Sequence, residues 1–156
     1  MIPEIHDYLA RRGIPYEVHH HQPVSTFEEA KRLLPFPPES LVKSLAFRLS
    51  SNAVGIAALR AVDRADYRRI SDAFGIRRSD LHAADAEDLR QIVGMEAGGV
   101  APIPLPGAVV VIDRKVESLP IVICGTGIRT SSLEIESSVF RVFNIGTFAD
   151  LRKVSG

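Results

Sequence analysis

The sequence predicts a single compact domain of the α+β class over residues 1–156. Its length is that of one domain, and 46% hydrophobic with 24% charged residues is typical of an ordinary globular protein. Two neighbouring strand-like segments, 41–49 and 54–60, flank the turn-forming pair Ser51-Asn52 and predict an antiparallel hairpin. Helix-like segments interrupt the strands without alternating strictly with them, which favours an α+β or mixed-sheet domain over a doubly wound one.

The remaining elements follow from periodicity and capping residues. Gly13 and Gly75 are placed as helix C-caps, and Thr26 with Glu29 forms a capping box. Apolar residues at helical spacing predict the helices, which are expected at 3–12, 26–34, 63–74, 85–93 and 138–143. Short apolar runs bounded by turn residues predict further strands at 16–20, 109–112, 121–124 and 133–135.

Charge, apolar runs and cysteine content restrict the class of protein. Nineteen basic and nineteen acidic residues give a net charge of zero, so a strongly basic nucleic-acid binder is not indicated. No apolar run approaches the ~18 residues that suggest a membrane-spanning helix, and the first residues lack the pattern of a signal peptide. The single cysteine, Cys124, has no partner for an intrachain disulfide, and we expect a cytoplasmic protein.

Two residue types invite a catalytic or metal-binding interpretation. In a strand, His19 and His21 share one face, as two metal ligands would. A zinc site needs three or four ligands and no nearby Cys or HxxxH pattern supplies them, so neither a metal nor a cofactor is expected. Cys124 ends the apolar run IVIC, and we expect a buried, unreactive thiol.

Lys43 stands inside the apolar strand LVKSLAF. Its alternation partners are Leu41, Leu45 and Phe47, so the side chain is predicted to point toward the apolar side of the sheet. A buried ammonium group is costly unless it lines a cavity or meets a partner. A lysine at a sheet edge, or one that extends its amine into water, is an equally weighted alternative.

The segment 60–78 contains six arginines and three aspartates, a local excess of three positive charges. Arg60, Arg64 and Arg68 are four residues apart, and those within the helix can share one face. Such a face suits a phosphate backbone, which makes these three arginines candidates for tRNA binding. A solvated helix with internal ion pairs is at least as plausible.

The stretch GMEAGGVAP, residues 94–102, places three glycines in nine positions and ends at a proline. It matches neither a P-loop nor a dinucleotide-binding fingerprint. It can be a tight connection, or a loop whose bare amides hold a ligand.

Four stretches, HQPVSTFEEA, LVKSLAF, GMEAGGVAP and ICGTG, together resemble the YbaK/ProX family of aminoacyl-tRNA deacylases, which includes the editing insertion of bacterial prolyl-tRNA synthetases. The resemblance spans residues 3–145. It implies a curved, barrel-like mixed β-sheet surrounded by helices. It also implies hydrolysis of the ester bond of mischarged aminoacyl-tRNA, with prolyl-tRNA synthetase as a possible partner.

The resemblance also implies which residues form the site. The lysine and the glycine-rich loop carry the catalytic role: Lys43, Gly98 and Gly99. The substrate-binding role falls on His21, Pro23, Thr26, Ser44, Val100, Ala101, Pro102 and Gly125. The loop amides would stabilise the oxyanion. The nucleophile would be water or the substrate's own side chain, because the sequence reveals no protein nucleophile with a paired base.

Ser44 bears on the substrate. In the family, one branch with asparagine after the lysine typically removes alanine, whereas Ser44 is closer to branches that handle cysteine, serine, threonine or other small residues. The carrier is often the proline tRNA.

Two alternatives to this function stay open: a non-catalytic aminoacyl-tRNA- or nucleotide-binding module, and a hydrolase of a small ester. We also expect Gly98→Val and Gly99→Val to impair catalysis more than stability, because the new side chains would occupy the space of the aminoacyl end.

Overall fold

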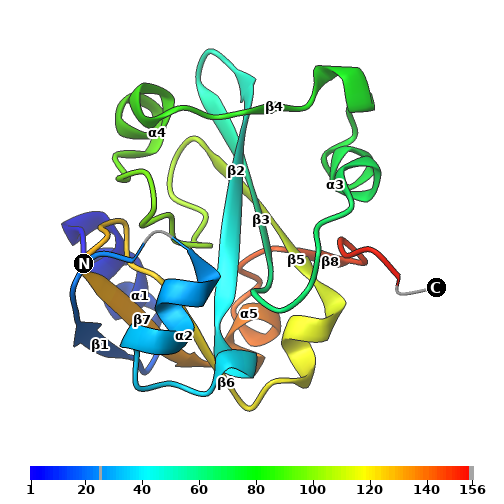
Figure 1. Ribbon diagram of the computed structural model, residues 1–156. Coiled ribbons are helices and arrows are strands. Elements are labelled where there is room, and N and C mark those ends of the chain that lie inside the picture. The colour runs from blue at the N-terminus through cyan, green and yellow to red at the C-terminus, as the bar shows by residue number, and fades with distance from the viewer. Residues whose placement is uncertain (25, 155–156) are drawn as a thin grey trace.

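Two β-sheets pack together in the computed structural model, which describes residues 1–24 and 26–154 (Figure 1). The smaller sheet is antiparallel and has the strand order β1-β7-β6. Its strands are β1 (Glu17–His20), β7 (Ser131–Glu136) and β6 (Ile121–Gly125).

The larger sheet is mixed and has the order β4-β2-β3-β5-β8. Its strands are β4 (His82–Ala83), β2 (Val42–Ser50), β3 (Ala53–Arg60), β5 (Ala108–Asp113) and β8 (Thr147–Ala149). The predicted hairpin is confirmed as β2 and β3, which pair antiparallel, whereas β3–β5 and β5–β8 are parallel.

The α+β class is therefore confirmed, but the barrel-like closure is not. Within the described residues the two sheets meet through a single isolated bridge between Leu41 and Ile123, so no closed barrel is found. This junction lies where β2 begins and β6 passes, and it positions the cavity described below.

The helices begin and end largely where capping residues predict. They are α1 (Pro3–Arg12), α2 (Phe27–Leu33), α3 (Tyr67–Phe74), α4 (Ala86–Val93) and α5 (Ser138–Val142), with 3₁₀ turns at Pro38–Ser40, Arg78–Asp80 and Arg114–Ser118. Gly13 and Gly75 adopt the left-handed conformation that a C-cap requires. The Thr26 hydroxyl accepts a hydrogen bond from the Glu29 amide at 3.1 Å. None of these helices has the length and apolar character needed to cross a membrane.

The start of α3 differs from the prediction. The helix begins at Tyr67 rather than at residue 63, because Asp66 caps it and accepts hydrogen bonds from the Arg68 and Arg69 amides. Asp63 instead pairs with Arg60.

The strands β4 and β8, of two and three residues, were not predicted, since segments so short show no measurable alternation.

The main core lies between the two sheets, and a second apolar cluster lies between the large sheet and α3. In Figure 1, α3 and α4 flank the long β2–β3 ribbon on its two sides. A third, smaller cluster beneath α2 contains Leu34, Leu41 and Ile123. Because α2 contributes no fully buried residue, this third cluster is a thin cover rather than a deep core.

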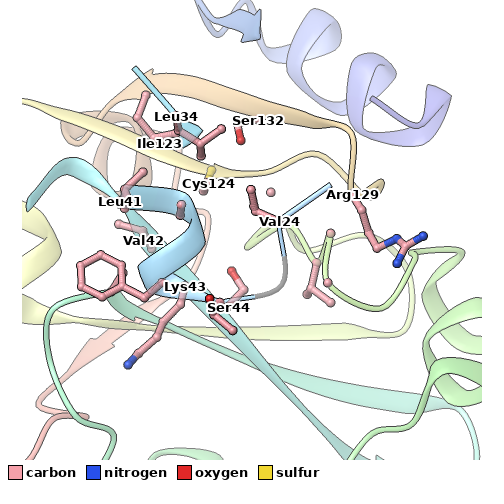
Figure 2. Close-up of a pocket in the computed structure, with 18 of the residues that line it drawn as sticks. Val24, Leu34, Leu41, Val42, Lys43, Ser44, Ile123, Cys124, Arg129 and Ser132 are labelled. Carbon is pink, nitrogen blue, oxygen red and sulfur yellow. The ribbon is translucent and has the colours of Figure 1, made fainter. Parts of the chain in front are cut away.

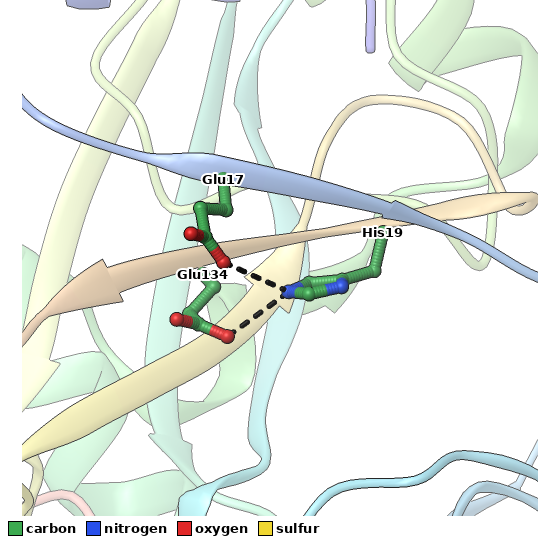
Figure 3. A group of neighbouring side chains, drawn as sticks. All are labelled: Glu17, His19 and Glu134. Atoms are coloured by element: carbon green, nitrogen blue, oxygen red, sulfur yellow. Dashed lines mark hydrogen bonds and ion pairs between the residues drawn. The ribbon is translucent and has the colours of Figure 1, made fainter.

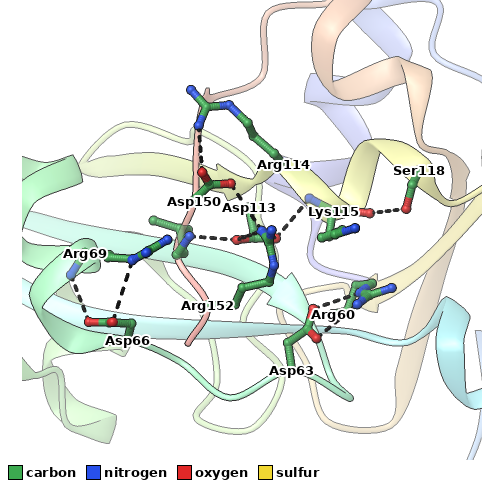
Figure 4. A network of polar contacts seen from close by, with 11 residues as sticks. Arg60, Asp63, Asp66, Arg69, Asp113, Arg114, Lys115, Ser118, Asp150 and Arg152 are labelled. Carbon is green, nitrogen blue, oxygen red and sulfur yellow. Dashed lines mark hydrogen bonds and ion pairs between the residues drawn. The ribbon is translucent and has the colours of Figure 1, made fainter. Parts of the chain in front are cut away.

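A buried carboxylate fixes the end of the chain against β5. Asp113 is completely buried and accepts hydrogen bonds from the Leu151 amide at 2.7 Å and from the Arg152 guanidinium at 3.0 and 3.1 Å (Figure 4). A separate pair in the same view joins Arg60 to Asp63 at 2.8 Å. That pair holds the 61–66 connection at the exit of β3, which borders the cavity.

Candidate functional site

A cavity of about 370 Å³ opens between α2, the start of β2, the 98–100 loop and strands β6 and β7 (Figure 2). Its apolar wall comes largely from the third cluster, with Phe27, Leu34, Leu41 and Ile123. The polar part of the lining consists of the backbone of residues 98–100 and the side chains of His21, Thr26, Lys43, Ser44, Arg129, Ser131 and Ser132. The lining, as far as the chain is described, contains no carboxylate.

Lys43 lies at the edge of this cavity. It shares a face of β2 with Leu45 and Phe47, which pack beneath α3, so its predicted placement beside apolar side chains is confirmed. Leu41 precedes the strand and packs beneath α2 instead. The Lys43 Nζ donates a hydrogen bond to the Asp63 carbonyl at 2.5 Å and points away from Cys124 and Ser132 in Figure 2. Burial lowers the pKa of Lys43, and the nearby Asp63 charge partly opposes this effect.

Ser44 contributes a hydroxyl that no other described residue engages. Its Oγ is buried and has no hydrogen-bond partner, although the residue lines the cavity. An unsatisfied buried hydroxyl typically costs about 1–3 kcal/mol. A ligand in the cavity could satisfy it.

The glycine-rich loop lies directly against the turn that follows β6. The Glu96 amide donates to the Gly127 carbonyl at 2.8 Å, and the Gly127 amide donates to the Gly99 carbonyl at 2.7 Å. A Cβ at Gly99 would lie 2.4 Å from the Ile128 carbonyl carbon, and a Cβ at Gly125 would lie 2.1 Å from the Val100 oxygen. These two glycines therefore allow two backbones to touch.

This geometry corrects one expectation about the loop. A side chain at Gly99 would meet the backbone of Ile128 rather than the space of an aminoacyl group. Gly98 has a φ of +84°, and a Cβ there would approach the flexible Arg129 side chain at 3.2 Å. The Gly98 and Val100 amides donate to no described residue, and both residues line the cavity.

Not every predicted substrate contact lines the cavity. His21, Thr26, Ser44, Val100 and Gly125 do, together with Lys43, Gly98 and Gly99. Three others do not: Pro23, Ala101 and Pro102. Pro23 is exposed, whereas Ala101 and Pro102 are buried, and the Ala101 amide contacts the Met95 sulfur at 3.4 Å. These two residues anchor the end of the loop in the core.

The three arginines predicted to bind tRNA do not share a helix face. Arg60 ends β3 and pairs with Asp63, Arg64 lies in the following connection, and Arg68 lies in α3. The late start of α3 is the reason. Arg64 and Arg68 are exposed and form no ion pair with a described residue, so their charges are accessible to solvent.

His19, in β1, and His21, which follows β1, both contact side chains of the neighbouring strand β7. His19 Nε2 lies 2.9 Å from a Glu134 oxygen and 3.8 Å from a Glu17 oxygen (Figure 3). The three side chains are spaced as metal ligands could be, but the hydrogen bond between His19 and Glu134 accounts for their proximity. Two residues after His19, the His21 Nε2 atom lies 2.7 Å from the Ser132 Oγ. The sequence did not reveal this pair, because its members are 111 positions apart and Ser132 belongs to no motif.

Cys124 lines the cavity but is almost completely buried. Burial raises the pKa of its thiol to about 12, so the thiol stays protonated at neutral pH. This agrees with the prediction of an unreactive cysteine.

A model of the aminoacyl-tRNA editing domain matches residues 21–143, which is most of the chain and includes the residues around the cavity. The chain belongs to the aminoacyl-tRNA editing domain family. The predicted resemblance to the YbaK family is thereby confirmed.

Curated relatives of this editing domain are larger proteins. The chain is 28% identical over 153 residues to the proline–tRNA ligase of Thermoanaerobacter sp. (strain X514), covering 96% of the chain and 26% of the ligase. It is also 28% identical over 130 residues to the proline–tRNA ligase of Lactobacillus acidophilus, covering 81% of the chain and 22% of that ligase. The chain thus spans about a quarter of the length of these ligases.

Two solved structures share the fold over almost their whole length. A protein described as hypothetical superposes with a TM-score of 0.81 at 23% identity, covering 96% of this chain and 99% of that one. A proposed trans-editing enzyme for prolyl-tRNA synthetase superposes with a TM-score of 0.78 at 20% identity, covering 99% of both chains. At such identities the likeness concerns the fold.

Proposed function

We propose that the protein hydrolyses, in trans, the ester bond of aminoacyl-tRNA that carries a small, wrongly attached amino acid. One observation carries the proposal above the others: acceptor-free amides of Gly98 and Val100 border the same cavity as Lys43 and the unsatisfied Ser44 hydroxyl. A volume of about 370 Å³ lies near the lower end of ligand pockets, which favours a small side chain.

The chemistry follows from these groups. Attack on the ester carbonyl places negative charge on its oxygen, and backbone amides aimed at that charge are a major source of rate enhancement. In the proposal, the Gly98 and Val100 amides supply these donors. Lys43 supplies positive charge to the ester or to the terminal ribose and phosphate. Ser44 donates or accepts a hydrogen bond at the substrate.

The proposed carrier is the proline tRNA, by analogy with the ligases that the chain resembles over about a quarter of their length. Prolyl-tRNA synthetase is the proposed partner for the same reason. The exposed Arg64 and Arg68 are proposed to contact tRNA phosphates.

The deciding experiment is a deacylation assay on proline tRNA charged with alanine, serine, cysteine or threonine, with correctly charged proline as control. At least one small amino acid should be released faster than in the absence of protein. Aminoacyl-adenosine, assayed in parallel, separates a tRNA deacylase from a hydrolase of small esters. Binding of the charged tRNA without release from any member of the panel would instead support a non-catalytic module.

A further inference from the structure

The His21–Ser132 pair has a defined direction of hydrogen bonding. His21 Nδ1 lies 2.7 Å from the Gln22 carbonyl oxygen, which can only accept a hydrogen bond. Nδ1 therefore carries the proton, and in the neutral imidazole Nε2 is the acceptor. Ser132 Oγ, at 2.7 Å, donates its proton to Nε2 and keeps its lone pairs free for another donor.

The pair is placed where the proposed reaction occurs. Both residues line the cavity, and Ser132 pairs across the small sheet with Gly125, whose backbone touches the glycine-rich loop. The described lining contains no carboxylate, and Lys43 directs its amine toward the Asp63 carbonyl. His21 is thus the best-placed proton acceptor of this lining.

We propose that Ser132 and His21 form a proton relay that activates the attacking water, an inference that rests on the proposed ester hydrolysis. The water oxygen bonds to the ester carbonyl carbon while one water proton passes to Ser132 Oγ. The Ser132 proton passes to His21 Nε2. When the carbon–oxygen ester bond breaks, the proton returns from His21 through Ser132 to the leaving ribose oxygen, which leaves a free amino acid and a free ribose hydroxyl.

The local structure favours this relay over direct attack by Ser132. Ser132 is only 8% exposed and lies within a regular strand, so a water molecule can reach its Oγ more easily than an ester carbon tethered to a tRNA. The Gln22 carbonyl holds the imidazole in the required tautomer and stabilises the imidazolium that forms. His21 acts through Ser132 and does not itself touch the ester.

Several charged groups surround the pair. His19 and Glu134 lie two residues along the chain from His21 and Ser132, the N-terminal amine lies 3.4 Å from Ser131 Oγ, and Arg129 and Lys43 line the cavity. His21→Gln keeps a hydrogen-bonding side chain but cannot relay a proton, so its rate–pH profile should differ from that of the wild type.

The test compares His21→Gln, Ser132→Ala and the double variant in single-turnover hydrolysis of both aminoacyl-tRNA and aminoacyl-adenosine. Each single variant should lose on the order of 10²–10⁴ in rate. The double variant should lose no more activity than the more impaired of the two single variants, because the two residues act as one unit. His20→Gln, at an exposed neighbour, and Ser71→Ala, at a buried serine bonded to the Arg68 carbonyl, are matched controls that should retain the wild-type rate.

The other possible outcomes would refute the proton relay, the tRNA deacylase activity, or both. Wild-type rates in folded His21→Gln or Ser132→Ala, or a covalent acyl group trapped on Ser132 by acid quenching, would refute the relay. Hydrolysis of aminoacyl-adenosine alone, with the same loss in the variants, would refute the tRNA deacylase proposal and leave the relay standing. Failure of the wild type on both substrates would refute both.

Discussion

Replacement of Gly99 by alanine tests how the glycine-rich loop is held. The new Cβ would lie 2.4 Å from the Ile128 carbonyl carbon and 2.6 Å from its oxygen, whereas an ordinary contact begins at 3.4 Å. The loop must therefore move away from the turn by about 1 Å. That shift would strain the two hydrogen bonds that join the loop to the turn, from the Gly127 amide to the Gly99 carbonyl at 2.7 Å and from the Glu96 amide to the Gly127 carbonyl at 2.8 Å.

The expected loss of stability follows from this overlap. Overpacking a close contact typically costs about 1–3 kcal/mol. In a domain of this size each kcal/mol lowers Tm by about 2–4 °C, so we expect Tm to fall by roughly 2–12 °C. The same displacement moves the Gly98 and Val100 amides, so deacylation per folded molecule should fall as well.

The assay combines thermal unfolding with deacylation normalised to the folded fraction. Gly94→Ala is the control, because Gly94 has a φ of +67° but nothing within 4 Å of an added Cβ. It should lower Tm through backbone strain and leave the rate per folded molecule unchanged. A Gly99→Ala protein with the wild-type Tm would refute the close contact between the loop and Ile128.

Three further predictions concern the proposed site. Lys43→Ala should abolish deacylation while leaving the fold intact, because it removes the cation at the cavity edge; circular dichroism checks the fold, and a wild-type rate would exclude a catalytic role. Cys124→Ala should be nearly silent in turnover, because burial raises the pKa of the thiol to about 12, and lost turnover at unchanged stability would point to covalent catalysis. Reversal of Arg64 and Arg68 to glutamate should raise the KM for charged tRNA and spare aminoacyl-adenosine, with a modest salt dependence of tRNA binding; equal effects on both substrates would show that these arginines act through folding.

Local sequence signals predicted the parts of the fold that depend on neighbouring residues. Gly13 and Gly75 end helices because their left-handed conformations are accessible without a side chain. Thr26 begins α2 because its hydroxyl reaches an amide three residues along. The β2–β3 hairpin also formed as predicted, since its two strands are joined by a short turn.

Non-local contacts decided the rest. The late start of α3 follows from two local contacts, the Asp66 cap and the Asp63–Arg60 pair, and from one distant contact, in which the Asp66 amide donates to the Leu151 carbonyl. The two open sheets replaced the expected barrel because strand pairing is a property of the whole chain. The short strand β8, for example, forms only because β5 offers it an edge.

The candidate site shows the same division. The sequence by itself determined that Lys43 sits beside apolar residues in a strand and that a glycine-rich loop precedes β5, because alternation and glycine content are local properties. Only the tertiary structure decided that Gly99 and Gly125 face other backbones and that His21 bonds to Ser132. Contacts between residues more than a hundred positions apart depend on sheet register, which fixes side-chain direction and which no single segment encodes.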